Sequence, residues 1–149
     1  MTPVDRLVAL EDIRRLKAEY FRCVDEQDWD ALVAVFTPDA ETDMRKAVEP
    51  ADPSLLLHDA ATFVANTSAV LAGVKTAHFG YVPRIDFQSD AEATGVWGME
   101  DWLWVAEGHP FLRFAKLHGW GRYHDRYVKT EDGWRIAATK LIRIHIDYD

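Results

Sequence analysis

Two residues of this chain, Asp25 and His78, have side chains suited to proton transfer. A histidine titrates near neutral pH and often serves as a general base, and a carboxylate on one ring nitrogen fixes its tautomer. Asp25 lies where the apolar repeat of the first predicted helix ends, and the helix dipole disfavours a negative charge there by about 0.3–1 kcal/mol. Asp25 therefore either faces water or meets a donor, and His78 is the best candidate. Together they could abstract a proton α to a carbonyl.

A phenol, Tyr20, precedes Asp25 in the same apolar stripe. It could donate a hydrogen bond to a developing enolate oxygen or to a leaving group. Proton abstraction alone would isomerise a substrate, whereas abstraction with loss of a β-substituent would be an elimination. Each residue also has a structural interpretation: Tyr20 and His78 as core residues, and Asp25 as an ordinary residue of the last helical turn.

A second pair of charges is predicted on strands. Asp101 shares a strand face with apolar residues, and burying a carboxylate alone is costly. Arg143, on the last predicted strand, is a plausible partner. The pair would either line a substrate pocket or form a structural ion pair. The histidines at 118, 124 and 145 fit no metal-ligand spacing, so solvated or core roles are expected for them, and no metal site is predicted.

The composition indicates one globular domain covering residues 1–149. Hydrophobic residues make up 48% and charged residues 28% of the chain. The net charge of −8 disfavours nucleic acid or an anionic membrane as a partner, since both need clustered cations. The single cysteine, Cys23, excludes an internal disulfide and is expected to be a small buried side chain. With no apolar signal core and no run long enough to span a membrane, a cytoplasmic protein is expected.

The first half of the chain has helical periodicity, and the second half alternates with period two. Three helix starts are predicted from N-cap residues: the hydroxyl of Thr2 and the carboxylates of Asp28 and Asp59. The expected N-terminal elements are helices over residues 2–24, 28–36 and 59–73, a turn over 37–39, a strand over 40–44, a loop over 45–53 and a strand over 55–58.

Four longer strands are expected over residues 74–88, 93–106, 117–129 and 134–146, with tight hairpin turns at 89–92 and 130–133. The tryptophans on these strands are expected mostly in the core. The segment 107–116, with Phe111, Leu112 and Phe114, is predicted to be a lid or an interface. Helices followed by an antiparallel sheet with a mixed edge indicate an α+β domain, in which the sheet curves around the three helices and leaves an apolar cavity.

Several motifs of the chain resemble those of one family. They are residues 13–25 and 28–32, then Ala-His-Phe-Gly at 77–80, Glu-Ala-Thr-Gly-Val-Trp at 92–97, Glu-Asp-Trp at 100–102, Tyr-His-Asp-Arg-Tyr at 123–127, Asp-Gly-Trp-Arg-Ile at 132–136 and Leu-Ile-Arg-Ile at 141–144. Over nearly its whole length the chain resembles the cone-shaped α+β fold of the nuclear transport factor-like superfamily, in its SnoaL-like branch. That branch includes bile acid 7α-dehydratase, scytalone dehydratase and hexachlorocyclohexane dehydrochlorinase.

The resemblance implies a cofactor-independent lyase of the dehydratase type, acting on a small hydrophobic cyclic or polycyclic substrate. It implies Tyr20, Asp25 and His78 as the core constellation, with Asp101 and Arg143 at substrate-binding positions. It also implies a homotrimer or homodimer. By the same resemblance, His124 is the candidate counterpart of a second histidine in scytalone dehydratase. Two alternatives stay open: a non-catalytic ligand-binding or assembly subunit, and a ketosteroid-type isomerase or polyketide cyclase.

Overall fold

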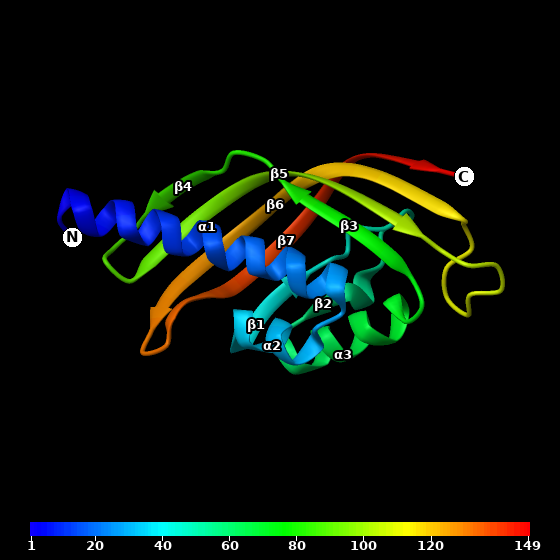
Figure 1. Ribbon diagram of the computed structural model, residues 1–149, viewed down its shortest axis with the longest axis horizontal. Helices are drawn as coiled ribbons and strands as arrows, with labels where there is room; N and C mark the ends of the chain where they lie inside the picture. The colour runs from blue at the N-terminus through cyan, green and yellow to red at the C-terminus, as the bar shows by residue number, and fades with distance from the viewer.

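A computed structural model describes all residues from 1 to 149. Figure 1 shows long strands that arch over α1, with α2 and α3 below one end of the sheet. The elements are α1 (Pro3–Glu26), α2 (Trp29–Val35), β1 (Phe36–Asp43), the 3₁₀ helix η1 (Pro53–Leu55), β2 (Leu56–Leu57), α3 (Ala60–Leu71), β3 (Lys75–Gly80), β4 (Arg84–Phe87), β5 (Glu92–Trp104), β6 (Lys116–Thr130) and β7 (Gly133–Tyr148).

The three helix starts predicted from the sequence are confirmed. Thr2 and Asp5 form a reciprocal capping box at the start of α1, and Asp28 and Asp59 cap α2 and α3. At its other end, α1 stops at Gln27, whose left-handed backbone (φ 57°) turns the chain towards α2. This stop places the last turn of α1 beside β3. None of the helices is long and apolar enough to cross a membrane.

The seven strands form one mixed sheet in the order β2-β1-β7-β6-β5-β3, with β4 also paired to β5. All neighbouring pairs are antiparallel except β1 and β7, which are parallel. The turn predicted over residues 37–39 is wrong, because these residues belong to β1. The β1–β7 register shifts between Phe36 and Glu41, and Pro38, which has no N–H for the ladder, lies in that irregular stretch.

The single strand predicted over residues 74–88 is also wrong, since it is divided into β3 and β4. Gly80 pairs with Met99, and Arg84 pairs with Val96. The chain between Gly80 and Arg84 is therefore one residue longer than the stretch of β5 between their two partners. The extra residue lies in the bend at residues 81–83, where Pro83 cannot donate a hydrogen bond. The bend leaves Val82 exposed at the sheet edge, with 91% of its surface accessible.

The two faces of the sheet differ in their cover. Trp97, Tyr123 and Tyr127 are buried on the concave face, towards α1. The expectation that the strand tryptophans are mostly core is only partly correct. Strand alternation places the side chains of Trp102, Trp104 and Trp120 on the convex face. No helix covers that face (Figure 1). On that face Trp102 stacks on the ring of His118, with centroids 3.4 Å apart.

The connection from β5 to β6 carries the three apolar residues predicted to form a lid or an interface. Leu112 and Phe114 pack against the edge of the core, and Phe114 contacts Tyr148, with ring centroids 5.1 Å apart. Phe111 alone is largely exposed.

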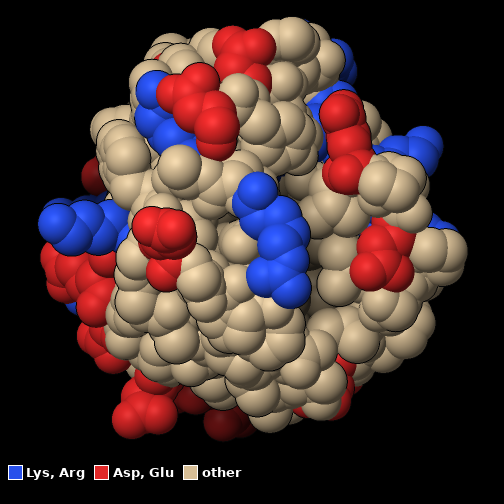
Figure 2. Space-filling model, turned by 90° about the vertical axis from the view of Figure 1, so that its right-hand side faces the viewer, with Lys and Arg blue, Asp and Glu red and all other residues tan.

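The end of the molecule seen in Figure 2 carries Asp and Glu side chains interspersed with separate Lys and Arg side chains.

Candidate functional site

The structure brings Asp25 and His78 together, as the helix-terminus argument predicts. His78 Nδ1 lies 2.6 Å from Asp25 Oδ1, and the His78 backbone N–H donates to Oδ2 over 3.0 Å. The hydroxyl of Thr76 donates to Oδ1 over 2.8 Å. Three donors from β3 therefore meet the carboxylate in the last turn of α1, and they offset the unfavourable helix dipole there.

The sheet register places Asp101 beside this pair. His78 on β3 is directly opposite Asp101 on β5, which in turn is opposite Gly119 on β6. His78 Nε2 lies 3.8 Å from Asp101 Oδ2. The imidazole thus has one carboxylate in hydrogen-bond contact at Nδ1 and a second carboxylate near Nε2, so a positive charge on the ring would be stabilised from both sides.

Arg143 is the partner of Asp101, as the sequence predicts. Its two terminal nitrogens contact the two carboxylate oxygens over 2.5 and 2.9 Å, and its Nε donates to the Ala47 carbonyl over 3.1 Å. Both side chains are almost fully buried. Burial alone would lower the pKa of Arg143, but the hydrogen bonds and negative charge of Asp101 outweigh it and raise the pKa. The Arg143 guanidinium therefore keeps its positive charge beside Asp101.

Gly119 allows this ion pair to form across a strand. Arg143 lies on β7 and Asp101 on β5, so the guanidinium must cross β6 between them. A Cβ at Gly119 would lie 2.3 Å from Arg143 Nη1 and 2.6 Å from Asp101 Oδ1. The absence of a side chain at this one position opens the passage.

Tyr20 lies deep in the same region, although no hydrogen bond joins it to Asp25 or His78. Its ring packs edge-on against Phe21, Phe36 and Tyr123, with centroids 5.6 to 6.0 Å apart. Burial raises the pKa of the Tyr20 phenol, and the negative charges of nearby carboxylates, Asp25 among them, raise it further. Tyr20 is therefore a protonated phenol at neutral pH.

A buried ion pair that was not predicted from the sequence lies next to Tyr20. Lys17 Nζ lies 2.7 Å from Asp125 Oδ2, and neither side chain is exposed to solvent. The ammonium group also lies 3.8 Å from the centroid of the Tyr123 ring and 4.6 Å from that of Tyr20. Asp125 accepts further hydrogen bonds from Tyr127 (2.7 Å) and Thr139 (2.6 Å). Burial lowers the pKa of Lys17, although Asp125 counteracts this.

The remaining histidines lie away from this region. His124 alternates with the buried Tyr123 and Asp125, so it points to the opposite, exposed face of β6. His118 and His145 also lie off the concave face, bonded to Glu100 (2.6 Å) and Asp147 (2.7 Å) respectively. No group of three His, Cys, Asp or Glu side chains has an arrangement that could hold a metal ion.

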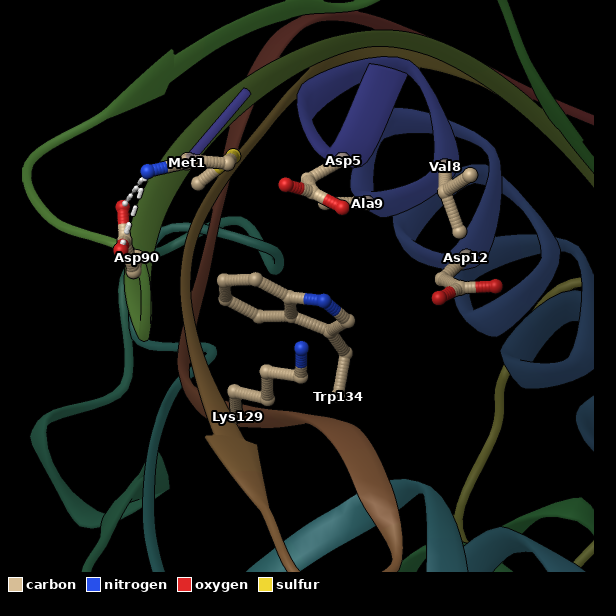
Figure 3. A pocket seen from close by; sticks show the side chains of 8 residues that line it. All are labelled: Met1, Asp5, Val8, Ala9, Asp12, Asp90, Lys129 and Trp134. Carbon is tan, nitrogen blue, oxygen red and sulfur yellow. Dashed lines mark hydrogen bonds and ion pairs between the residues drawn. The ribbon is translucent and has the colours of Figure 1, made fainter. Parts of the chain in front are cut away.

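Aromatic rings fill much of the space between α1 and the sheet, and two hollows of about 260 Å³ each lie beside them. The first is at the N-terminal end of α1, where the Trp134 indole lies across from Asp5 and Asp12 (Figure 3). The second is between α1 and the bend at residues 81–83, and it is lined in part by Phe21. The Phe21 ring is nearly parallel to the His78 imidazole, with centroids 6.4 Å apart, although neither Asp25 nor His78 lines the hollow itself.

Comparison with known proteins identifies the family. A model of the SnoaL-like domain matches residues 5–140. Among solved structures, a scytalone dehydratase candidate from Novosphingobium aromaticivorans is 19% identical, with a TM-score of 0.83, over 98% of this chain and 91% of that one. The hexachlorocyclohexane dehydrochlorinase LinA-type3 from Novosphingobium barchaimii is 17% identical, with a TM-score of 0.80, over 99% and 94%.

A Mycobacterium tuberculosis protein of unknown function is 24% identical, with a TM-score of 0.74, over 96% of this chain and 76% of that one. At these identities the likeness concerns the fold. The family model, by contrast, covers most of the chain. The chain therefore belongs to the SnoaL-like domain family, and its three helices and open curved sheet form the α+β cone predicted from the sequence.

Proposed function

We propose that this protein is a cofactor-independent lyase that eliminates water, or a similar leaving group, from a small hydrophobic cyclic or polycyclic substrate. The observation that carries the proposal is the 2.6 Å contact between Asp25 Oδ1 and His78 Nδ1. A carboxylate in this position holds the proton on Nδ1 and leaves the lone pair on Nε2. His78 then has the tautomer of a general base.

In the proposed reaction, His78 Nε2 takes the proton α to a substrate carbonyl. The electron pair of the broken C–H bond forms the new double bond and expels the β-hydroxyl group. The imidazolium returns its proton to that group, which leaves as water. Asp25 at Nδ1 and Asp101, 3.8 Å from Nε2, stabilise the imidazolium in the interval.

Tyr20 and Arg143 are assigned supporting roles. The pKa of the Tyr20 phenol is raised by burial, so it keeps its proton and can donate to the enolate oxygen or to the leaving group. Arg143 fixes the position of the Asp101 carboxylate through two hydrogen bonds, and we assign both residues to substrate binding. The names of the similar dehydratase and dehydrochlorinase agree with an elimination. A substrate without a β-leaving group would instead exchange its α-proton, and it would be isomerised only if it held a double bond that could shift.

We also expect the protein to act as a homodimer or homotrimer in the cytoplasm. The convex sheet face carries Trp102, Trp104 and Trp120 without a covering helix. An aromatic face of this kind is suited to contact with a second copy of the chain.

The proposal can be tested without knowing the natural substrate. Cyclic ketones, with and without a β-hydroxyl group, are incubated with the protein in D₂O and followed by NMR and mass spectrometry. We expect deuterium at the α-carbon of the plain ketones and loss of one water from the β-hydroxy ketones. His78→Ala should abolish both signals, whereas His124→Ala, a matched change on the exposed face, should leave both intact. Equal exchange rates in the wild type and His78→Ala would refute a catalytic role for His78.

A further inference from the structure

The hollow between α1 and the bend at residues 81–83 has the features of a binding site. Its volume is about 260 Å³, and its walls are mostly apolar and aromatic, with contributions from Ala18, Phe21, Val82 and Trp97. A space of this size with flat walls is suited to one or two fused rings. It lies on the concave side of the sheet, next to the edge at which β3 gives way to β4.

Arg14 is the one charged residue that lines this hollow. Two other arginines of α1 are paired with carboxylates: Arg15 with Glu11, and Arg22 with Glu19. Arg14 has no hydrogen bond or ion pair with any other side chain. Its guanidinium group is therefore free to bind a ligand, and a guanidinium binds a carboxylate through two parallel hydrogen bonds.

Phe21 connects the hollow to the Asp25–His78 pair. Its ring lines the hollow and also stacks on the His78 imidazole, at an interplanar angle of 13°. The ring can occupy this position because residue 80 is a glycine: a Cβ there would lie 2.6 Å from a Phe21 ring carbon. The hollow and the His78 imidazole thus share Phe21 as a common neighbour.

We propose that this hollow binds flat aromatic or polycyclic carboxylates, with Arg14 holding the carboxylate and Phe21 separating the bound ring system from His78. In relation to the reaction, the hollow would be the entrance to the Asp25–His78 pair, and only this last step rests on the proposed function. Arg14 thereby becomes a specificity-determining residue, which favours acidic over neutral hydrophobic substrates.

The test compares two probes of the same shape, naphthoate and naphthylmethanol, by calorimetric titration and by backbone amide shifts. We expect naphthoate to bind more tightly and to shift the amides of Ala18, Gly80 and Val82. Arg14→Gln should weaken naphthoate binding about tenfold and leave naphthylmethanol unchanged. Arg15→Gln, one residue along the same helix, should alter neither affinity.

The outcome separates this inference from the proposed reaction. His78→Ala should still bind naphthoate through Arg14, even though it would be inactive. If naphthoate does not bind at millimolar concentration, if Arg14→Gln leaves the ratio of the two affinities unchanged, or if the shifted amides cluster around Trp134 in the other hollow, the inference is wrong. In each of these cases the Asp25–His78 proposal would stand or fall on its own test.

Discussion

Asp25 holds His78 at two points, through the ring nitrogen Nδ1 over 2.6 Å and through the backbone N–H over 3.0 Å. The same carboxylate therefore fixes both the orientation of the imidazole and the position of β3 against the end of α1. An amide at position 25 could still accept hydrogen bonds through its oxygen, but it carries no negative charge. The two contributions of Asp25, geometric and electrostatic, can thus be separated by one substitution.

For Asp25→Asn we expect kcat to fall by about 10³ to 10⁴ because the imidazolium loses its counter-charge and the tautomer is no longer fixed. The hydrogen bond from the His78 backbone can persist, so the thermal unfolding midpoint should fall by only a few degrees. Steady-state kinetics on a confirmed substrate and calorimetry measure the two effects. Wild-type rates in this variant would contradict the Asp25–His78 model.

Removal of the Tyr20 hydroxyl should affect the reaction more than the fold. Tyr20→Phe keeps the edge-on packing against Phe21, Phe36 and Tyr123. We expect kcat to fall by about 10- to 1000-fold, as for the loss of one donor to a developing oxyanion, and KM to change little. Tyr148→Phe at the C-terminal edge is the control. If KM rose while kcat stayed unchanged, Tyr20 would instead be a binding residue.

Lys17 and Asp125 should behave as one structural unit. Lys17→Met leaves a buried carboxylate without its counter-charge, and we expect the free energy of unfolding to fall by about 3–5 kcal/mol. The double variant Lys17→Met/Asp125→Asn removes both charges while its amide oxygen keeps an acceptor for one of the two donors, Tyr127 and Thr139, and should recover part of that loss. Urea titrations provide the numbers, with the exposed Lys129→Met as control. An additive double variant would show that the two charges do not interact.

Asp43 should make the stability depend on pH in acid. Hydrogen bonds from Arg45 lower the pKa of Asp43 to about 2, against 3.8 ordinarily. Because the folded pKa is the lower one, this contribution is complete above about pH 4 and is lost as the pH falls towards 2. Allowing for the partly exposed guanidinium, it amounts to about 1–2 kcal/mol.

The corresponding measurement is the urea midpoint of the wild type and of Arg45→Gln between pH 6 and pH 2. The difference between the two proteins should be largest at the upper end and should shrink below pH 4. A difference that stays constant over this range would assign the effect to packing of the Arg45 side chain and not to its charge.

The Asp25–His78 and Asp101–Arg143 pairs could be predicted from the sequence because each contains a charge in a place where it needs a partner. Lys17 gave no such signal, since a lysine within an apolar helical stripe is usually at its solvent-facing border. Its partner Asp125 lies on a strand whose register is set by contacts along the whole sheet. The prediction for the tryptophans was inaccurate for a different reason. Trp97 and Trp102 are an odd number of residues apart on β5, so strand alternation places their side chains on opposite faces of the sheet. Composition alone does not distinguish the two.

Asp25 and His78 are 53 residues apart in the chain, and all of α2, α3, β1 and β2 lie between them. Closing a loop of this length costs conformational entropy before any contact rewards it. No partly folded form in which α1 is detached from β3 can therefore contain the pair. After dilution from urea, recovery of turnover would report when α1 and β3 have come together, whereas circular dichroism would report the formation of helices and strands.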